Sequence, residues 1–177
     1  MNPVHDVSIG NPPEQLNVFI EIPRGSKNKY ELDKESGLIT LDRVLPGPQV
    51  YPMDYCMVPQ THWHDGDPLD AVIFNTGDPY YPGVLVPVRP VGVIRMVDDG
   101  ENDEKLICVP TGEPRLAEVK DKNDIPPHVL KELVDFFENY KNLQGKQVTI
   151  EKIEGRAAAY GVIKEAQALY QKQFGSK

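Results

Sequence analysis

Short hydrophobic runs, separated by turn-forming residues, recur along most of the chain. Several are rich in β-branched residues, which is typical of β-strands. The 17 prolines and 14 glycines favour many short elements joined by tight turns. A Glu35-Ser36-Gly37 turn between two of the runs predicts a β-hairpin. We expect strands at residues 16–22, 29–32, 38–43, 69–74, 84–97, 105–109 and 147–153.

Helical periodicity is confined to the last third of the chain. In residues 127–143, apolar side chains recur at spacings of three and four, and Asp124 with two following prolines marks a plausible helix start. Residues 156–170 are alanine-rich and form a second apolar stripe. The pattern therefore predicts a mainly β, α+β fold, in which a small, twisted, closed antiparallel sheet carries two helices on its outside.

Length and charge narrow the classes of protein that remain. The 177 residues, 40% of them hydrophobic, suit one domain spanning residues 1–177. A net charge of −8 disfavours nucleic acid and anionic lipid as partners. The longest apolar stretch, 84–97, is too short and too polar to span a membrane, and the N-terminus does not resemble a signal peptide. We therefore expect a cytoplasmic protein that contacts no membrane.

The densest group of chemically useful residues is Asp65-Gly-Asp-Pro-Leu-Asp70. Gly66 and Pro68 favour a compact turn that can direct several carboxylates to one point. Such crowding raises carboxylate pKa values, and a hard divalent cation removes the penalty. The spacing excludes an EF-hand, whose loop needs a different series of ligands. A solvated acidic turn is the alternative and is about as common.

A second acidic group, Asp98 to Asp103, lies between two expected strands. If these strands pair as a hairpin, Asp98 and Asp103 close its loop, and a metal ion would offset their repulsion. Lys105 lies two residues beyond Asp103 and shares its face of the sheet. A cation beside paired acids suits a metal–phosphate site, although an exposed acidic loop explains the same pattern.

Several other residues are suggestive only in combination. Lys29 and Glu31 share one strand face, and histidines 62 and 64 precede the acidic turn without a third metal ligand, so a surface role is favoured for the histidines. Cys56 is interpreted as a small core residue. The remaining residues of interest are Arg43, Tyr51, Tyr55, Tyr140 and Lys141.

Taken together, these motifs resemble the soluble family I inorganic pyrophosphatases in their short bacterial form. The run Asp65 to Asp70 is similar to the family's signature, which is highly specific, and the resemblance extends over residues 18–141. Cys56 and Met57 depart from the glycine and aromatic residue that usually follow Tyr55. The other matching segments are Ile20–Pro23, Lys29–Glu31, Asp42–Arg43, Tyr51–Pro52, Tyr55, Arg89–Gly92, Asp98, Asp103, Lys105 and Phe136–Lys141.

The resemblance implies an OB-like β-barrel with outer helices, a homohexamer, and Mg²⁺-dependent hydrolysis of pyrophosphate to two orthophosphates by a metal-activated water. It implies that Asp65, Asp70 and Asp103 hold one Mg²⁺, with Asp70 shared by a second ion. Asp98 and Asp103 would take the metal that arrives with substrate, and Glu21 and Glu31 would act through waters or an additional ion. Asp67 would be the general base, and Tyr51 would support the site. The groups implied to bind phosphate are Lys29, Arg43, Tyr55, Lys105, Tyr140 and Lys141, of which Tyr55, Lys29, Arg43 and Lys105 also serve catalysis.

Two other functions remain to be weighed. A metal-dependent hydrolase of larger polyphosphates would need an apolar or aromatic recognition pocket, and the sequence shows no clear one. A non-catalytic OB-type binder of nucleic acid would need a basic groove with stacking aromatics, which the acidic turns and the negative charge disfavour.

Overall fold

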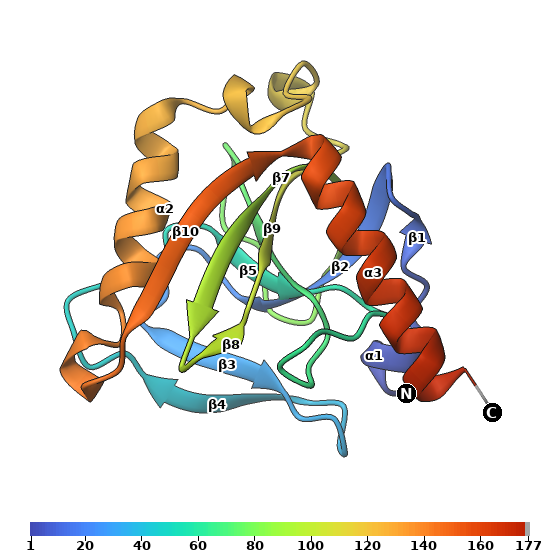
Figure 1. Ribbon diagram of the computed structural model, residues 1–177, viewed down its shortest axis with the longest axis horizontal. Helices are drawn as coiled ribbons and strands as arrows, with labels where there is room; N and C mark the ends of the chain where they lie inside the picture. The colour runs from blue at the N-terminus through green and yellow to red at the C-terminus, as the bar shows by residue number, and fades with distance from the viewer. Residues whose placement is uncertain (176–177) are drawn as a thin grey trace.

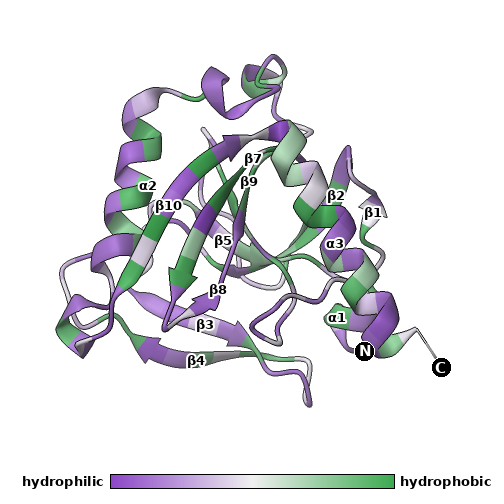
Figure 2. Ribbon diagram, in the orientation of Figure 1, coloured by the Kyte–Doolittle hydropathy of each residue, from purple (hydrophilic) through white to green (hydrophobic). Residues whose placement is uncertain are grey.

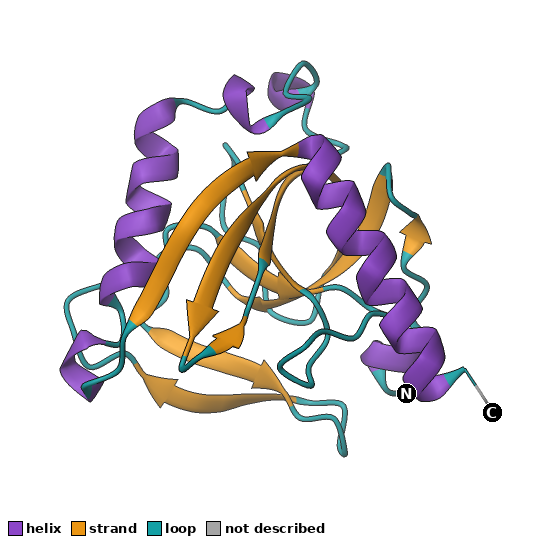
Figure 3. Cartoon of the chain, in the orientation of Figure 1, coloured by secondary structure: helices purple, strands orange, loops and turns teal. Residues whose placement is uncertain are grey.

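The computed structural model describes residues 1–175. Strands form the centre of the molecule and helices lie on its outside (Figures 1 and 3). The strands are β1 (Gly10–Asn11), β2 (Gln15–Ile22), β3 (Asn28–Leu32), β4 (Ile39–Val44), β5 (Asp54–Met57), β6 (Asp70–Ile73), β7 (Leu85–Asp98), β8 (Glu101–Asn102), β9 (Lys105–Pro110) and β10 (Val148–Gly155). The helices are α1 (Pro3–Asp6), α2 (Pro127–Asn139) and α3 (Arg156–Phe174), with 3₁₀ turns η1 (Pro114–Leu116), η2 (Lys122–Asp124) and η3 (Asn142–Gln144).

Five strands close into a ring. The order is β2, β5, β6, β9 and β7, and β7 pairs again with β2. The long strand β7 makes closure possible, because its first residues pair with β2 and its central residues pair with β9. Its register against β9 shifts between Pro90 and Gly92, where Pro90 has no N–H to donate to the ladder. The predicted closed OB-like barrel is thus confirmed, and β3 with β4 forms the predicted hairpin beside it.

One pairing departs from the antiparallel arrangement that the sequence predicted. Strands β6 and β9 run parallel, with Asp70 beside Lys105. A parallel neighbour requires a crossover connection, and here the chain between β6 and β9 supplies it by passing through the whole of β7. Lys105 therefore reaches Asp70 through sheet register and not through a local turn.

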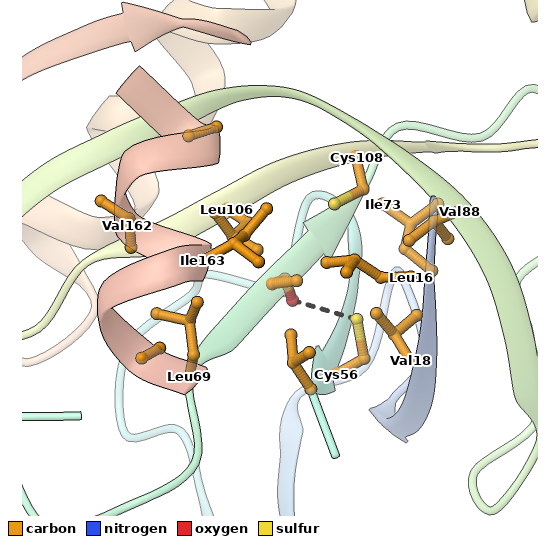
Figure 4. Packing of buried hydrophobic residues seen from close by; sticks show 14 of the residues in the cluster. Leu16, Val18, Cys56, Leu69, Ile73, Val88, Leu106, Cys108, Val162 and Ile163 are labelled. Carbon is orange, nitrogen blue, oxygen red and sulfur yellow. Dashed lines mark hydrogen bonds between the residues drawn. The ribbon is translucent and has the colours of Figure 1, made fainter. Parts of the chain in front are cut away.

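Two hydrophobic clusters hold the helices on the barrel. Successive residues of a strand point to opposite faces, and in β9 Leu106 and Cys108 join one cluster while Ile107 and Val109 join the other. The first cluster packs against α3, as Figure 4 shows for Leu106, Cys108, Val162 and Ile163. The second packs against α2. Hydrophobic and hydrophilic residues likewise alternate along β10 (Figure 2).

The structure differs from the expected element boundaries in a few places. Helix α2 ends at Asn139 instead of residue 143, because the chain tightens into η3 and turns at Gly145, which has a positive φ of 71°. Asp124 belongs to a capping box with Asp121, the N-cap of η2, and does not begin α2, which Pro126 precedes without a side-chain cap. Strands β1, β5 and β8 and helix α1 were not predicted. Within residues 1–175, no helix combines the length and apolarity required to cross a membrane.

Candidate active site

A polar cleft of about 240 Å³ lies at one end of the barrel, beside the β3–β4 hairpin. Residues from seven segments of the chain line it, and most of them are charged. All of the predicted site residues except Arg43 are present. The acids are Glu21, Glu31, Asp65, Asp67, Asp70, Asp98 and Asp103, the lysines are 29, 34, 105 and 141, and the tyrosines include Tyr55 and Tyr140.

Lys105 connects the two acidic groups. Its Nζ donates to Asp70 Oδ2 at 2.7 Å and to Asp103. The hydroxyl of Tyr55 donates to the same oxygen of Asp70. The side chain of Lys105 is only 3% exposed, so its charge is held inside the protein by the two carboxylates. The structure thus brings together the acidic turn and the acidic loop, as the sequence suggested.

Burial and mutual repulsion disturb the pKa values of several acids. Burial, together with repulsion from the neighbouring carboxylates of Asp70 and Asp103, raises the pKa of Asp65 to about 6. Burial followed by the charge of Asp70 raises the pKa of Glu21 to about 8. Burial lowers the pKa of Lys105, but the two carboxylates outweigh it and hold this pKa above its ordinary value. The cleft therefore favours added positive charge.

The hairpin β3–β4 supplies another charged group. Lys29 Nζ bonds Glu31 and lies 3.1 Å from Asp42 Oδ2, while Arg43 Nη1 donates to the same Asp42 oxygen at 2.7 Å. Asp42 therefore holds Arg43 at the flank of the cleft and not in its lining. The sequence-based expectation that Arg43 joins the other site residues is met only in part, since Lys29 and Arg43 are direct cross-strand partners.

The acidic loop differs in detail from the simple hairpin that was expected. Strand β8 makes Glu101 the partner of Asp98, so Asp98 and Asp103 are not directly opposed. The two acids still line the same cleft. Asp98 Oδ2 pairs with Lys141, which follows α2, while Asp98 Oδ1 is buried without a hydrogen-bond partner among the described residues.

Lys34 is the cleft residue that sequence reasoning missed. It follows β3 and forms an ion pair with Asp67, the predicted general base. Its only sequence signal was its position directly after the strand that carries Lys29 and Glu31. Both partners are more than half exposed, so the pair lies at the open side of the cleft.

The lining suits divalent cations by its chemistry. Carboxylate oxygens are the preferred ligands of Mg²⁺, and the unpartnered Asp98 Oδ1 can accept one more bond. In residues 1–175, no three acid, histidine or cysteine side chains already converge on one point. Each cleft lysine instead pairs with a carboxylate. The cleft residues therefore fit divalent cations, which would compete with the lysines for the same carboxylates.

Tyr51, Cys56 and His64 lie outside the lining of the cleft. Tyr51 is 3% exposed and packs edge-on against Tyr55, with ring centroids 5.7 Å apart. Cys56 is fully buried and donates to the Ala71 carbonyl oxygen at 3.2 Å (Figure 4). Burial raises the pKa of its thiol well above the ordinary value, which confirms a core residue. His64 is exposed and pairs with Glu165 of α3, in line with its expected surface role.

Comparison with known proteins decides the family. Residues 18–171 match the sequence profile of the family described as inorganic pyrophosphatase. The chain belongs to the inorganic pyrophosphatase family. Membership of this family confirms the resemblance inferred from the motifs and the expectation of an enzyme. Pyrophosphatases of this family are in general metal-dependent, which agrees with the acidic lining of the cleft.

Individual pyrophosphatases resemble the chain over almost its whole length. That of Picrophilus torridus is 45% identical over 169 residues, which cover 95% of each chain. That of Geobacillus stearothermophilus is 49% identical over 158 residues, covering 89% of this chain and 95% of the relative. The crystal structure of inorganic pyrophosphatase from Thermus thermophilus has a TM-score of 0.91 and 42% identity, and covers 96% of this chain and 99% of its own. The pyrophosphatase fold is therefore shared from end to end.

Proposed function

We propose that this chain hydrolyses inorganic pyrophosphate to two orthophosphates with the help of several Mg²⁺ ions. The observation that carries the proposal is one small cleft in which seven carboxylates and four lysines meet. Carboxylates suit cations and lysines suit phosphate oxygens. Family membership supports the same reaction.

We assign the metal ligands as the resemblance to the family implies, and all of these acids line the one cleft. Asp65, Asp70 and Asp103 would hold one ion, with Asp70 shared by a second, and Asp98 with Asp103 would take the ion that accompanies the substrate. Glu21 and Glu31 would act through water or a further ion. Mg²⁺ bound there would neutralise phosphate charge and make a nearby water more acidic.

The cationic and phenolic groups would bind the phosphates. Each lysine in the cleft already donates to a carboxylate, and a phosphate oxygen would replace that carboxylate as acceptor. Tyr55 and Tyr140 line the same cleft and offer hydroxyl donors. Arg43 would reach the phosphates from the flank of the cleft by exchanging its contact with Asp42.

The resemblance to the family implies that Asp67 accepts a proton from the attacking water. Its side chain is 61% exposed at the mouth of the cleft, whereas Asp70 is largely enclosed. We assign to Asp67 the role of general base, which receives the proton of the water as that water attacks in line with the leaving phosphate. No covalent nucleophile takes part.

The size and lining of the cleft favour pyrophosphate over larger polyphosphates. Its volume of about 240 Å³ lies below the roughly 300–1,000 Å³ of pockets for drug-sized ligands. Charged side chains form most of the wall, so the cleft suits a small ligand of high charge.

Phosphate release from pyrophosphate tests the proposed function. We expect rapid release with excess Mg²⁺, and none after the metal is removed with a chelator. Adding Mg²⁺ back in excess over the chelator should restore the rate. Absence of release from the folded, Mg²⁺-loaded protein would show that the family's motif is retained here without its activity.

Lys141 should contribute to substrate affinity more than to the chemical step. Its amine pairs with Asp98 in a part-buried position, and loss of a charge-assisted hydrogen bond typically costs about 1.5–3 kcal/mol. We expect Lys141→Ala to raise KM about tenfold or more while kcat changes by less than about threefold. Steady-state kinetics measure both, with the exposed Lys131→Ala on α2 as control. A fall in kcat at unchanged KM would contradict this role.

The organisation of the chain is also proposed. We infer one domain over residues 1–177, because strands such as β9 supply both large hydrophobic clusters. Residues 176–177 lie outside the described part.

Exposed apolar side chains, including Leu41, Val44 and Tyr81, support association of copies into a homohexamer. Light scattering would measure the mass of the assembly. We also propose a cytoplasmic location, as the sequence predicts.

A further inference from the structure

A buried hydrogen bond joins the acidic turn to the strand that carries Lys105. The indole Nε1 of Trp63 donates to Glu104 Oε2 at 2.7 Å. The two residues are 3% and 7% exposed. A carboxylate this deeply buried is costly unless its oxygens are paired, so the bond holds both side chains in one arrangement.

Each partner lies next to residues of the proposed active site. Trp63 precedes Asp65 by two residues, its backbone N–H donates to the Asp67 carbonyl oxygen at 2.8 Å, and its own carbonyl oxygen accepts from Gly66 at 3.1 Å. Glu104 lies between Asp103 and Lys105 in the chain. The Trp63–Glu104 bond therefore spans the two segments that supply most of the carboxylates.

Asp65 and Asp67 depend on this hydrogen bond for their position more than Asp70 does. Asp70 opens strand β6, and pairing with β9 fixes it beside Lys105. Asp65 and Asp67 lie before that strand, in a turn outside the sheet. The side chain of Trp63 fixes this turn relative to Glu104, the residue directly before β9.

The remaining oxygen of Glu104 faces a second anchor. Arg95 Nη1 lies 3.5 Å from Glu104 Oε1, and Arg95 Nε donates to Glu154 Oε2 at 2.7 Å. Arg95 and Glu154 belong to β7 and β10, so the barrel itself holds the carboxylate in place. Glu104 is thus oriented from the sheet side and offers a fixed acceptor to Trp63.

We propose that Trp63 and Glu104 are positioning residues that set the distance between the acidic turn and Asp103, and thereby the affinity for Mg²⁺. This inference rests on the proposed function, since it assumes that Asp65, Asp70 and Asp103 share an ion. Neither residue lines the cleft. They act by placing ligands, as outer partners of metal sites do.

The test measures Mg²⁺ binding directly, by calorimetry on the full-length protein without substrate. We expect Glu104→Ala and Trp63→Phe each to weaken Mg²⁺ binding about tenfold, the lower end of the range for outer partners. Glu104→Gln keeps an acceptor for the indole and should stay within about threefold of wild type. Glu165→Ala, which removes the exposed partner of His64, is the control and should match wild type. Trp63 is the only tryptophan of the chain, so its fluorescence follows the same titration in the Glu104 variants.

Kinetics and thermal unfolding separate positioning from a general loss of structure. Positioning predicts reduced hydrolysis at limiting Mg²⁺, with kcat recovering at saturating Mg²⁺. Because truncation of a buried side chain can prevent folding, Trp63→Phe decides the matter if Glu104→Ala does not fold. If both variants had lower melting temperatures but bound Mg²⁺ within twofold of wild type, the positioning role would be wrong. The proposed function would not be affected by that result. A wild-type protein that neither binds Mg²⁺ nor releases phosphate would overturn the proposed function and the inference with it.

Discussion

Replacing Asp70 with asparagine is expected to lower the turnover of pyrophosphate by more than about a thousandfold, even with Mg²⁺ saturating. Asp70 is the acid on which the site converges, since Lys105 and Tyr55 both donate to its Oδ2. In the proposed mechanism it also serves two ions. Asparagine keeps the shape of the side chain but loses the charge, so the fold should survive while the rate collapses.

The matched control for this change is Asp78→Asn, which neutralises an exposed carboxylate outside the cleft. Its rate should equal that of wild type. Phosphate release measured over a range of Mg²⁺ concentrations distinguishes lost affinity from lost chemistry. A rate near wild type for Asp70→Asn at saturating Mg²⁺ would disprove the shared-ligand assignment.

Lys105→Met should reduce both stability and activity. The substitution leaves Asp70 and Asp103 together without the cation that separates them, and breaking a buried ion pair typically costs about 3–5 kcal/mol. Mg²⁺ should restore part of this loss, because it supplies positive charge to the same carboxylates. We also expect hydrolysis to fall about a hundredfold or more, since a proposed phosphate-binding group is removed.

Urea unfolding with and without Mg²⁺ measures the stability change of Lys105→Met. The control is Lys146→Met, because Lys146 pairs with Asp99 at the surface with both side chains about half exposed. Exposed pairs contribute about 0–1 kcal/mol, so this control should change little. Equal effects of the two substitutions, or no gain in stability from Mg²⁺ in Lys105→Met, would show that burial of Lys105 carries no special role.

Much of the fold could be predicted because local pattern and tertiary structure agree. The strands β2, β7 and β9 and the helix α3 begin close to where their hydrophobic patterns begin. Strand β5 was missed because its four residues are too short to show periodicity, and they lie among prolines that favour turns. The parallel pairing of β6 and β9 could not be predicted, since it depends on how the whole barrel closes.

The candidate site shows the same division. The carboxylates of the acidic turn lie close together in sequence, so their convergence on one cleft was predictable from the chain itself. Lys34 and Arg43 depend on the tilt of the β3–β4 hairpin, which no local pattern encodes. The partner of Asp98 depends on strand β8, a two-residue element that sets the register of the loop. The contacts of side chains on or beside irregular segments were therefore the hardest to predict from the sequence.

Closure of the barrel has a consequence for how the protein acquires its activity. Strand β2 meets β7 by pairing Leu16 with Val88 and Phe19 with Leu85, so a long stretch of chain must be confined before the ring forms. Non-local pairing of this kind makes folding slow, because loop entropy is lost before the contacts compensate for it. The cleft is lined by residues from Val4 to Lys141. During refolding, hydrolysis should therefore return only with the last, ring-closing step, later than the far-ultraviolet signal of the helices.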